Sequence, residues 1–325
     1  MTMKLSRTRA VEVLRAAGEP TRLRILSLLA HDELAVMELS QILNQSQPRV
    51  SRHLKLLTEA GLVERFPDGA WVFYRLPAAD PGRSTAERLL SLVDDEDPAW
   101  LRDAEQLEAV RGARMADAAN YFERNAQHWN EIRSLYVAED QVEAAILEAA
   151  GPGPHRRLID LGTGAGRMLA LLGPKAQSAV GLDLSNQMLN VARRAMSEAG
   201  LVRVELRHGD IFATGLPSAD ADLVVIHRVL HYLADPAAAV AEAARLLAPG
   251  GRLLIVDFAP HGHEFLREEH QHRRLGFTDE EIARWLEAAD VVHDASLALP
   301  PATSGGLTVK IWTASRPKLP IRNAA

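Results

Sequence analysis

The sequence predicts a multidomain chain in which an α+β domain precedes a larger α/β domain with a mostly parallel sheet. Three observations predict these fold classes. Residues 1–80 show four helical patterns and then two β-rich runs, whereas short apolar runs alternate with helical patterns from residue 157 onward. The chain has 325 residues, enough for about two domains of ordinary size, and 47% of them are hydrophobic, which supports packed cores.

Charge and composition narrow the class of protein. The first 80 residues carry 11 Lys and Arg against 9 Asp and Glu, while the whole chain carries 37 against 43. A mildly basic domain ahead of an acidic one favours nucleic-acid contact at the N-terminus. The absence of cysteine excludes disulfides, thiolate zinc sites and cysteine nucleophiles. Because neither a signal peptide nor an apolar run of about 18 residues is present, we expect a cytoplasmic protein without a membrane span.

Residues 1–80 follow the element order of a winged helix-turn-helix domain. Pro20 suits the first turn of a helix, and Gly61 suits the left-handed position that ends one. Asp68-Gly69 between two β-rich runs is typical of a hairpin turn. We expect helices over 6–17, from Glu19-Pro20 onward, over 36–43 and over 47–60, and hairpin strands over 62–66 and 71–76.

The fourth helix has the pattern of a recognition helix. Val50, Leu54 and Leu57 keep helical spacing for a core, and polar residues fill the opposite face. Such a helix can enter the major groove, present side chains to base edges and place Arg and Lys on phosphates. We expect DNA contacts from Gln47, Arg49, Ser51, Arg52, His53 and Lys55, and from Arg65, Trp71 and Arg75 in the wing.

Two stretches of this domain, Gly18-Glu-Pro-Thr-Arg-Leu-Arg-Ile-Leu and Val50-Ser-Arg-His-Leu-Lys-Leu-Leu-Thr-Glu-Ala-Gly-Leu-Val, carry a family resemblance. Over residues 8–78 the chain resembles the ArsR family of bacterial transcription regulators. The resemblance implies a homodimer that binds a double-stranded DNA operator. Many members sense metals through cysteines on the third helix, but Ala35-Val-Met37 stands there, which excludes that route. The alternative is a winged helix that serves only protein contacts or dimerisation.

Residues 81–118 are polar and mostly helical in pattern, and we expect a helical linker that can supply a dimerisation surface. The domain that follows spans residues 119–317. Its strands alternate with helices, which indicates a doubly wound sheet, and two closing strands bring the expected number to seven. We expect strands over 157–161, 178–183, 202–207, 222–227, 251–258, 291–299 and 307–315, and helices over 165–173, 185–199, 236–247 and 278–289.

A glycine-rich loop, Asp160-Leu-Gly-Thr-Gly-Ala-Gly166, follows the first of these strands. Glycines let the backbone approach a ligand closely, and the helix behind them presents free N–H groups. Asp183 ends the second strand, where an acid can bind both ribose hydroxyls, and Asp210 and Ile211 follow the third, where they can bracket an adenine. The alternatives are an ordinary tight turn and a dinucleotide site, whose Gly-x-Gly-x-x-Gly spacing differs from this one.

This ordered set resembles the class I methyltransferases that use S-adenosylmethionine (SAM), over about residues 120–316. The resemblance implies a Rossmann-like fold, SAM as cofactor and S-adenosylhomocysteine (SAH) as product. Asp160 and the glycines are expected to hold the amino acid part of SAM, Asp183 the ribose, and Asp210 with Ile211 the adenine. The expected cofactor residues are Asp160, Gly162, Thr163, Gly164, Gly166, Asp183, Leu184, Met188, Asp210, Ile211 and His227.

Candidate catalytic residues follow the fourth strand. His227 is expected near the cofactor, and His231, four residues on, would share a helical face with it, so that either can take a proton from an acceptor. The alternative is that both only pack. The two-proline aromatic motif of amide- and adenine-directed methyltransferases is absent, which favours a small-molecule acceptor. Tyr121, Phe122 and Trp129 precede the sheet and can either cover SAM or pack in the core.

Four histidines, His261, His263, His270 and His272, stand near Glu264, Glu268 and Glu269 and raise the question of a metal site. Histidines two residues apart do not share a helical face, so we expect no metal here and assign the segment to the flank of an acceptor pocket. Arg273 and Arg274 can attract an anionic group. Two functions remain open: a DNA-binding methyltransferase, or a catalytically silent sensor whose SAM or SAH occupancy controls DNA binding.

Overall fold

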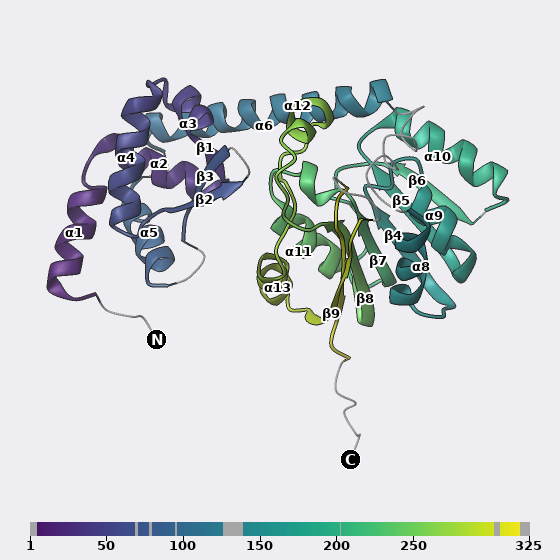
Figure 1. Cartoon of the computed structure of the whole chain (residues 1–325). Helices are drawn as coiled ribbons and strands as arrows, with labels where there is room; N and C mark the ends of the chain where they lie inside the picture. The colour runs from purple at the N-terminus through teal and green to yellow at the C-terminus, as the bar shows by residue number, and fades with distance from the viewer. Residues whose placement is uncertain are drawn as a thin grey trace, which may run out of the picture. The chain divides into compact units, whose positions relative to one another are not determined.

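The computed structural model describes residues 5–68, 71–77, 80–94, 96–125, 139–201, 203–301 and 306–318 (Figure 1). The chain forms two compact units, residues 1–116 and 117–325. No helix among the described residues is long and apolar enough to cross a membrane.

The first unit has the winged helix-turn-helix order that its sequence predicts, with one short strand added. The side chains of Ser6 and Glu19 accept hydrogen bonds from the first turns of the first two helices, and Gly61 ends the fourth with a φ of 64°. The strands form an antiparallel sheet in the order β1-β3-β2. The elements are α1 (Arg7–Ala17), α2 (Pro20–His31), β1 (Leu34–Ala35), α3 (Val36–Leu43), α4 (Gln47–Glu59), β2 (Glu64–Asp68), β3 (Trp71–Arg75), α5 (Gly82–Leu90) and α6 (Pro98–Asn125).

Two helices after the hairpin share the core of this unit. Ala86 of α5 and Leu107 and Val110 of α6 are buried in the same apolar cluster as α2 and α4. Arg24 of α2 forms a two-pronged ion pair with the buried Asp103 of α6, at 2.6 and 2.5 Å. Part of the region expected to be a linker is therefore folded onto the first unit.

The second unit contains the expected seven-stranded sheet, in the order β6-β5-β4-β7-β8-β10-β9. The first five strands in this order pair in parallel, and β10 runs antiparallel to both β8 and β9. The elements are α8 (Glu139–Ala150), β4 (His155–Leu161), α9 (Arg167–Leu172), β5 (Ala176–Asp183), α10 (Asn186–Glu198), β6 (Val204–His208), β7 (Ala221–His227), η3 (Leu230–Tyr232), α11 (Pro236–Leu246), β8 (Leu247–Phe258), α12 (Phe265–His270), α13 (Asp279–Ala288), β9 (Val292–Leu299) and β10 (Val309–Ser315), with the turn η2 (Gly173–Lys175) before β5.

Alternating residues of the central strands enter two different cores. Ile159 belongs to the core that includes residues of α11 and α13, whereas its neighbour Leu158 belongs to the core that includes residues of α8 and α9. These two pairs of helices cover opposite faces of the sheet (Figure 1). Helix α8 was not expected, although Val142, Ile146 and Ala150 repeat every four residues and bury one helical face. The sheet is thus covered on both sides, which leaves its strand ends for a site.

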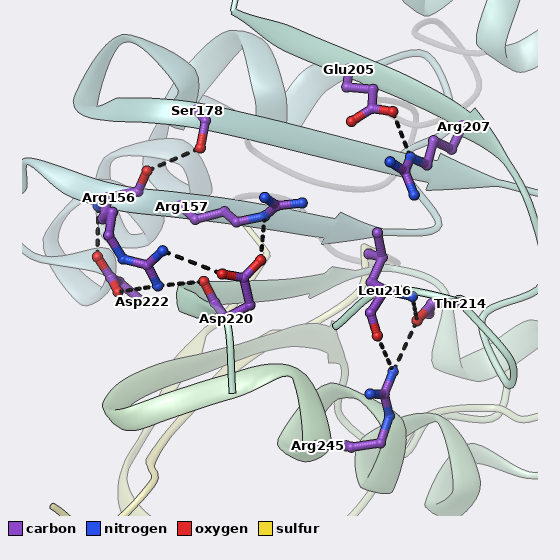
Figure 2. A network of polar contacts seen from close by, with 10 residues as sticks. All are labelled: Arg156, Arg157, Ser178, Glu205, Arg207, Thr214, Leu216, Asp220, Asp222 and Arg245. Atoms are coloured by element: carbon purple, nitrogen blue, oxygen red, sulfur yellow. Dashed lines mark hydrogen bonds and ion pairs between the residues drawn. The ribbon is translucent and has the colours of Figure 1, made fainter. Parts of the chain in front are cut away.

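The amino edge of the sheet is held together by charged side chains. Figure 2 shows Arg156 and Arg157 of β4 reaching Asp220, directly before β7, and Asp222, its second residue. The backbone N–H of Arg156 also donates to Asp222 at 2.6 Å. These contacts lie at the edge opposite the glycine loop, so they stabilise the strand pairing away from the candidate site.

Candidate functional site

The glycine loop joins the carboxyl ends of β4 and β5. The N–H groups of Gly162 and Thr163 donate to the carbonyl of Leu182 at 2.8 and 2.9 Å, and Gly164 N–H donates to the carboxylate of Asp183 at 2.7 Å. Gly162 has a φ of 73°, and a Cβ there would lie 2.4 Å from Cγ2 of Val229. The loop therefore depends on glycine both for its backbone conformation and for its contact with the segment after β7.

Replacing Gly162 by alanine is expected to lower the free energy of unfolding by about 2–3 kcal/mol, because left-handed strain adds to overpacking against Val229. Gly200→Ala is the matched control. Gly200 has a φ of 66° but open space around its missing Cβ, so it carries the strain without the clash. Urea denaturation of both variants measures the difference, and equal losses would contradict the close packing at Gly162.

Two carboxyl groups face this loop from neighbouring strands. Asp160 of β4 is 1% exposed; its Oδ2 accepts from the Thr163 hydroxyl at 2.6 Å, and its Oδ1 has no hydrogen-bond partner among the described residues. Burial raises the pKa of Asp160 to about 7. Burial also raises the pKa of Asp183, against the hydrogen bonds that it accepts from Ser185 and Gly164. Asp160 thus keeps one buried acceptor atom available for a donor.

The adenine end predicted from the sequence lies at the next strand of the sheet. Asp183 ends β5 beside His208 of β6, and the N–H of Gly209 donates to the Asp183 carbonyl at 3.0 Å. Asp210 Oδ1 accepts from Phe212 N–H at 2.9 Å, while Ile211 packs into the core beside α11. The chain therefore brings the ends of β4, β5 and β6 to one edge, as a bound nucleoside requires.

The other predicted cofactor residues differ in exposure. Leu184 is exposed directly after β5, so it can lie along a ligand. Met188 is buried within α10, where its side chain contributes to packing. Gly166 begins α9 in the left-handed conformation, with a φ of 81°. Of these residues, Leu184 is therefore accessible to a ligand, whereas Gly166 and Met188 are buried beside it.

The two candidate catalytic histidines do not share a helical face. His227 is the last residue of β7, partly buried and opposite Val256 of β8. Arg228 follows with a φ of 53°, and His231 lies in the turn η3, 1% exposed. Its Nδ1 lies 2.7 Å from Oδ1 of Asp257. The expectation of a shared helical face is wrong because His227 ends a strand, and the left-handed Arg228 changes the direction of the chain before His231.

Asp257 is a polar residue that the sequence reasoning missed. It stands as the only acid in the apolar run Leu253–Phe258 and is fully buried. An acid within a buried strand is a signal that could have been found, because such a group requires a partner.

No group of three or more described His, Asp or Glu residues is arranged to hold a metal. Arg274, expected to attract an anion, is buried.

The recognition helix α4 presents a polar face in the first unit. Gln47, Arg49, Ser51, Arg52 and Lys55 are all exposed, and Val50, Leu54 and Leu57 are buried as expected. His53 differs: its side chain is 13% exposed, its Nδ1 lies 3.6 Å from Glu19, and burial lowers its pKa. We therefore expect His53 to position α4 against α2 more than to contact bases.

The two wing arginines have different surroundings. Arg65 is exposed, whereas Arg75 is 3.1 Å from Glu33 and 3.2 Å from Glu64, with its guanidinium 4.8 Å from the centre of the Phe66 ring. Glu64 and Arg75 stand directly opposite each other in the hairpin, so their opposite charges form a stabilising cross-strand pair. The side chains of Trp71, Tyr121 and Phe122, and all of Trp129, lie outside the described residues.

Comparisons with known proteins agree with both parts of the chain. Residues 159–255 match the model of a methyltransferase domain, and residues 19–65 match that of the bacterial regulatory protein arsR family. A demethylmenaquinone methyltransferase of Clavibacter sepedonicus is 38% identical over 128 residues, covering 38% of this chain and 51% of that protein. An uncharacterized methyltransferase, YcgJ of Bacillus subtilis, is 29% identical over 140 residues, covering 43% and 54%. The chain thus spans about half the length of these curated relatives.

A solved structure supports the fold of the second unit. The N-methyltransferase NodS of Bradyrhizobium japonicum, in complex with SAH, superposes with a TM-score of 0.53 at 16% identity, covering 62% of this chain and 99% of that one. The expected Rossmann-like sheet is confirmed. The chain joins a helix-turn-helix domain of the ArsR family to a methyltransferase domain.

Proposed function

We propose that the second unit binds SAM and methylates a small molecule, and that the first unit places the protein, as a dimer, on a DNA operator to regulate transcription. The observation that carries the proposal is the pair of carboxyl groups, Asp160 and Asp183, at the ends of neighbouring strands. They flank a loop in which a side chain at Gly162 would clash with Val229. The names of the curated relatives, which include methyltransferases of menaquinone biosynthesis, support a small organic acceptor.

The residues at this edge fit SAM group by group. Oδ1 of Asp160 is a buried acceptor that the SAM ammonium can satisfy. Each oxygen of Asp183 accepts one backbone hydrogen bond, which leaves lone pairs for two ribose hydroxyls. Asp210, just after β6, lies at the same edge for the adenine, and Ile211 beside it is buried in the core. Bound SAM supplies a methyl group on a positive sulfur, so the protein's main task is to align an acceptor with it.

A second candidate function, ligand sensing, is favoured by the helix α6. This helix runs from Pro98 to Asn125, across the division between the two units after residue 116. Its first half is fixed in the first unit by Asp103 and Arg24, and by Arg111 and Asp32 at 3.2 Å. A ligand that shifts the population of α6 conformations in the second unit would then alter the DNA-binding unit.

One set of measurements tests both functions. Calorimetry with SAM and SAH tests binding, and duplexes selected from a random pool give an operator for fluorescence anisotropy with and without each ligand. Absence of SAM and SAH binding would overturn both functions. Operator curves that are identical with and without ligand would remove the sensor, and SAH release with a panel of small acceptors would support the enzyme.

The raised pKa of Asp160 leads to a pH-dependent prediction. The carboxyl group is neutral below its pKa of about 7 and must ionise to accept the SAM ammonium, so SAM affinity should fall by up to about tenfold per pH unit below that value. One proton should be released on binding, measurable as calorimetric heats that differ between buffers. The Asp160→Asn variant should bind SAM more weakly than the wild type, and its affinity should lose most of the dependence on pH. If the affinity of the wild type for SAM does not change between about pH 5.5 and 7, the proposed contact between Asp160 and the SAM ammonium is contradicted.

A further inference from the structure

A cluster of buried and partly buried polar side chains lies beside the proposed cofactor edge. We call it the imidazole cluster: His231 after β7, Asp257 near the end of β8, and His261 and His272 in the segments on either side of α12. Strand β7 lies between β4 and β8, so these ends are one and two strands beyond the glycine loop. The cluster is therefore placed where an acceptor would meet the cofactor.

The side chain of His231 is held in one orientation. Oδ1 of Asp257 accepts from the N–H of Phe258 at 2.8 Å and lies 2.7 Å from Nδ1 of His231. An ionised Asp257 can only accept, so Nδ1 of His231 would donate to it and Nε2 would keep a lone pair. The carbonyl of His231 also accepts from the N–H groups of Arg273 and Arg274 at 2.8 and 3.0 Å. Ring and backbone are thus both fixed.

Three buried atoms of the cluster have no hydrogen-bond partner among the described residues: Oδ2 of Asp257, Nδ1 of His272 and Nε2 of His261. Asp257 is 0% and His272 7% exposed. A buried polar atom without a partner costs free energy, so several in one cluster indicate that a ligand completes the set.

The charges of the cluster select the kind of group. Burial lowers the pKa of His261 to about 4 and that of His272 far below its ordinary value, so both rings are neutral at physiological pH. The carboxylate of Asp257 disfavours an anion, and two cations beside the cluster already have acidic partners, Arg228 in Glu139 and Arg267 in Glu264. Around His231, the rings of His272 and Tyr232 lie 4.1 Å and that of Phe258 5.2 Å away, centre to centre. A neutral, proton-donating group on a flat ring matches these surroundings.

We propose that His231, oriented by Asp257, accepts the proton of a neutral phenolic hydroxyl group, so that the acceptor of this domain is a hydroxylated aromatic compound methylated on oxygen. The proposal rests on the proposed methyltransferase function and names its substrate class. The acceptor oxygen bonds to the methyl carbon as the carbon–sulfur bond breaks, the bonding pair stays on sulfur, and the hydroxyl proton passes to Nε2 of His231. The resulting imidazolium is paired with Asp257.

The first test concerns Asp257 as a positioning residue. In long-range proton–nitrogen spectra of histidine-labelled full-length protein, His231 should carry its proton on Nδ1. Asp257→Asn can donate to the ring and should move that proton to Nε2, while Asp222→Asn, at the opposite sheet edge, should not. Circular dichroism monitors folding of both variants. A proton on Nε2 in the wild type would overturn the proposal, and this holds whether or not Asp257→Asn folds.

The second test uses phenol, anisole and benzoate as probes of the SAH-saturated wild-type protein. Phenol should shift the His231 and His272 resonances in a saturable manner, anisole should not because it lacks the proton, and benzoate should bind more weakly than phenol. No response to phenol, an equal response to anisole, or tighter binding of benzoate would each overturn the proposal. Failure of SAH itself to bind in calorimetry would instead refute the proposed function, so the two failures are distinguishable.

Discussion

Replacing Asp183 by alanine is expected to weaken SAM binding by roughly 100- to 10,000-fold. The variant removes the acceptors proposed for two ribose hydroxyls, and hydrogen bonds to a charged group contribute about 1.5–3 kcal/mol each. Those acceptors are already oriented, because Gly164 and Ser185 each donate a backbone hydrogen bond to one carboxylate oxygen at 2.7 and 2.8 Å. Calorimetry with SAM and with SAH measures the loss.

The control for this prediction is Asp222→Ala. It makes the same chemical change at the amino edge of the sheet, where Asp222 accepts from the N–H of Arg156 and lies 3.6 Å from its guanidinium (Figure 2). Its affinity for SAM should match the wild type. Because Asp183→Ala also leaves two N–H groups without their acceptor, thermal unfolding without ligand must show that the variant is folded at the assay temperature. Wild-type affinity in a folded Asp183→Ala protein would remove the ribose assignment.

Much of this site could be predicted because its features are local in the chain. The glycine loop, the strand before it and the helix after it occupy consecutive residues, and the alternation of Leu158 and Ile159 between two cores follows from the period of a strand. Asp183 could be placed because a strand of ordinary length brings it to the same edge. These inferences needed no knowledge of distant contacts.

The remaining features depend on partners far apart in the sequence. His231 meets Asp257, 26 residues later, and Arg228 meets Glu139, 89 residues earlier, at 2.5 Å. No periodicity encodes such pairs. Strand β1 has only two residues and exists because Leu34 and Ala35 pair with Tyr74 and Phe73 of β3. Its sequence carries too short a pattern to indicate a strand by itself.

The DNA-binding unit provides the second prediction of large effect. Arg49→Ala is expected to weaken operator binding by roughly 5- to 100-fold, because an exposed arginine near the start of a recognition helix can make a two-pronged contact with guanine worth about 1–3 kcal/mol. The loss should be larger for the selected operator than for unrelated DNA, since a base contact contributes to specificity. Anisotropy titrations with both duplexes, at one fixed salt concentration, measure it.

Arg75→Ala is the informative comparison because the sequence assigned both arginines to DNA. The guanidinium of Arg75 is already paired with Glu33 and Glu64 and lies against Phe66, so its charge is largely compensated within the wing. Its removal should leave operator affinity within about twofold of the wild type while lowering stability by about 1–2 kcal/mol, since two partly buried carboxylates each lose an ion pair. Equal losses of affinity in the two variants would mean that Arg75 leaves its carboxylates to reach DNA. A stable Arg75→Ala protein with full affinity would show instead that the ion pairs contribute little to the wing. The pair of variants therefore separates the arginines that contact DNA from those that shape the wing.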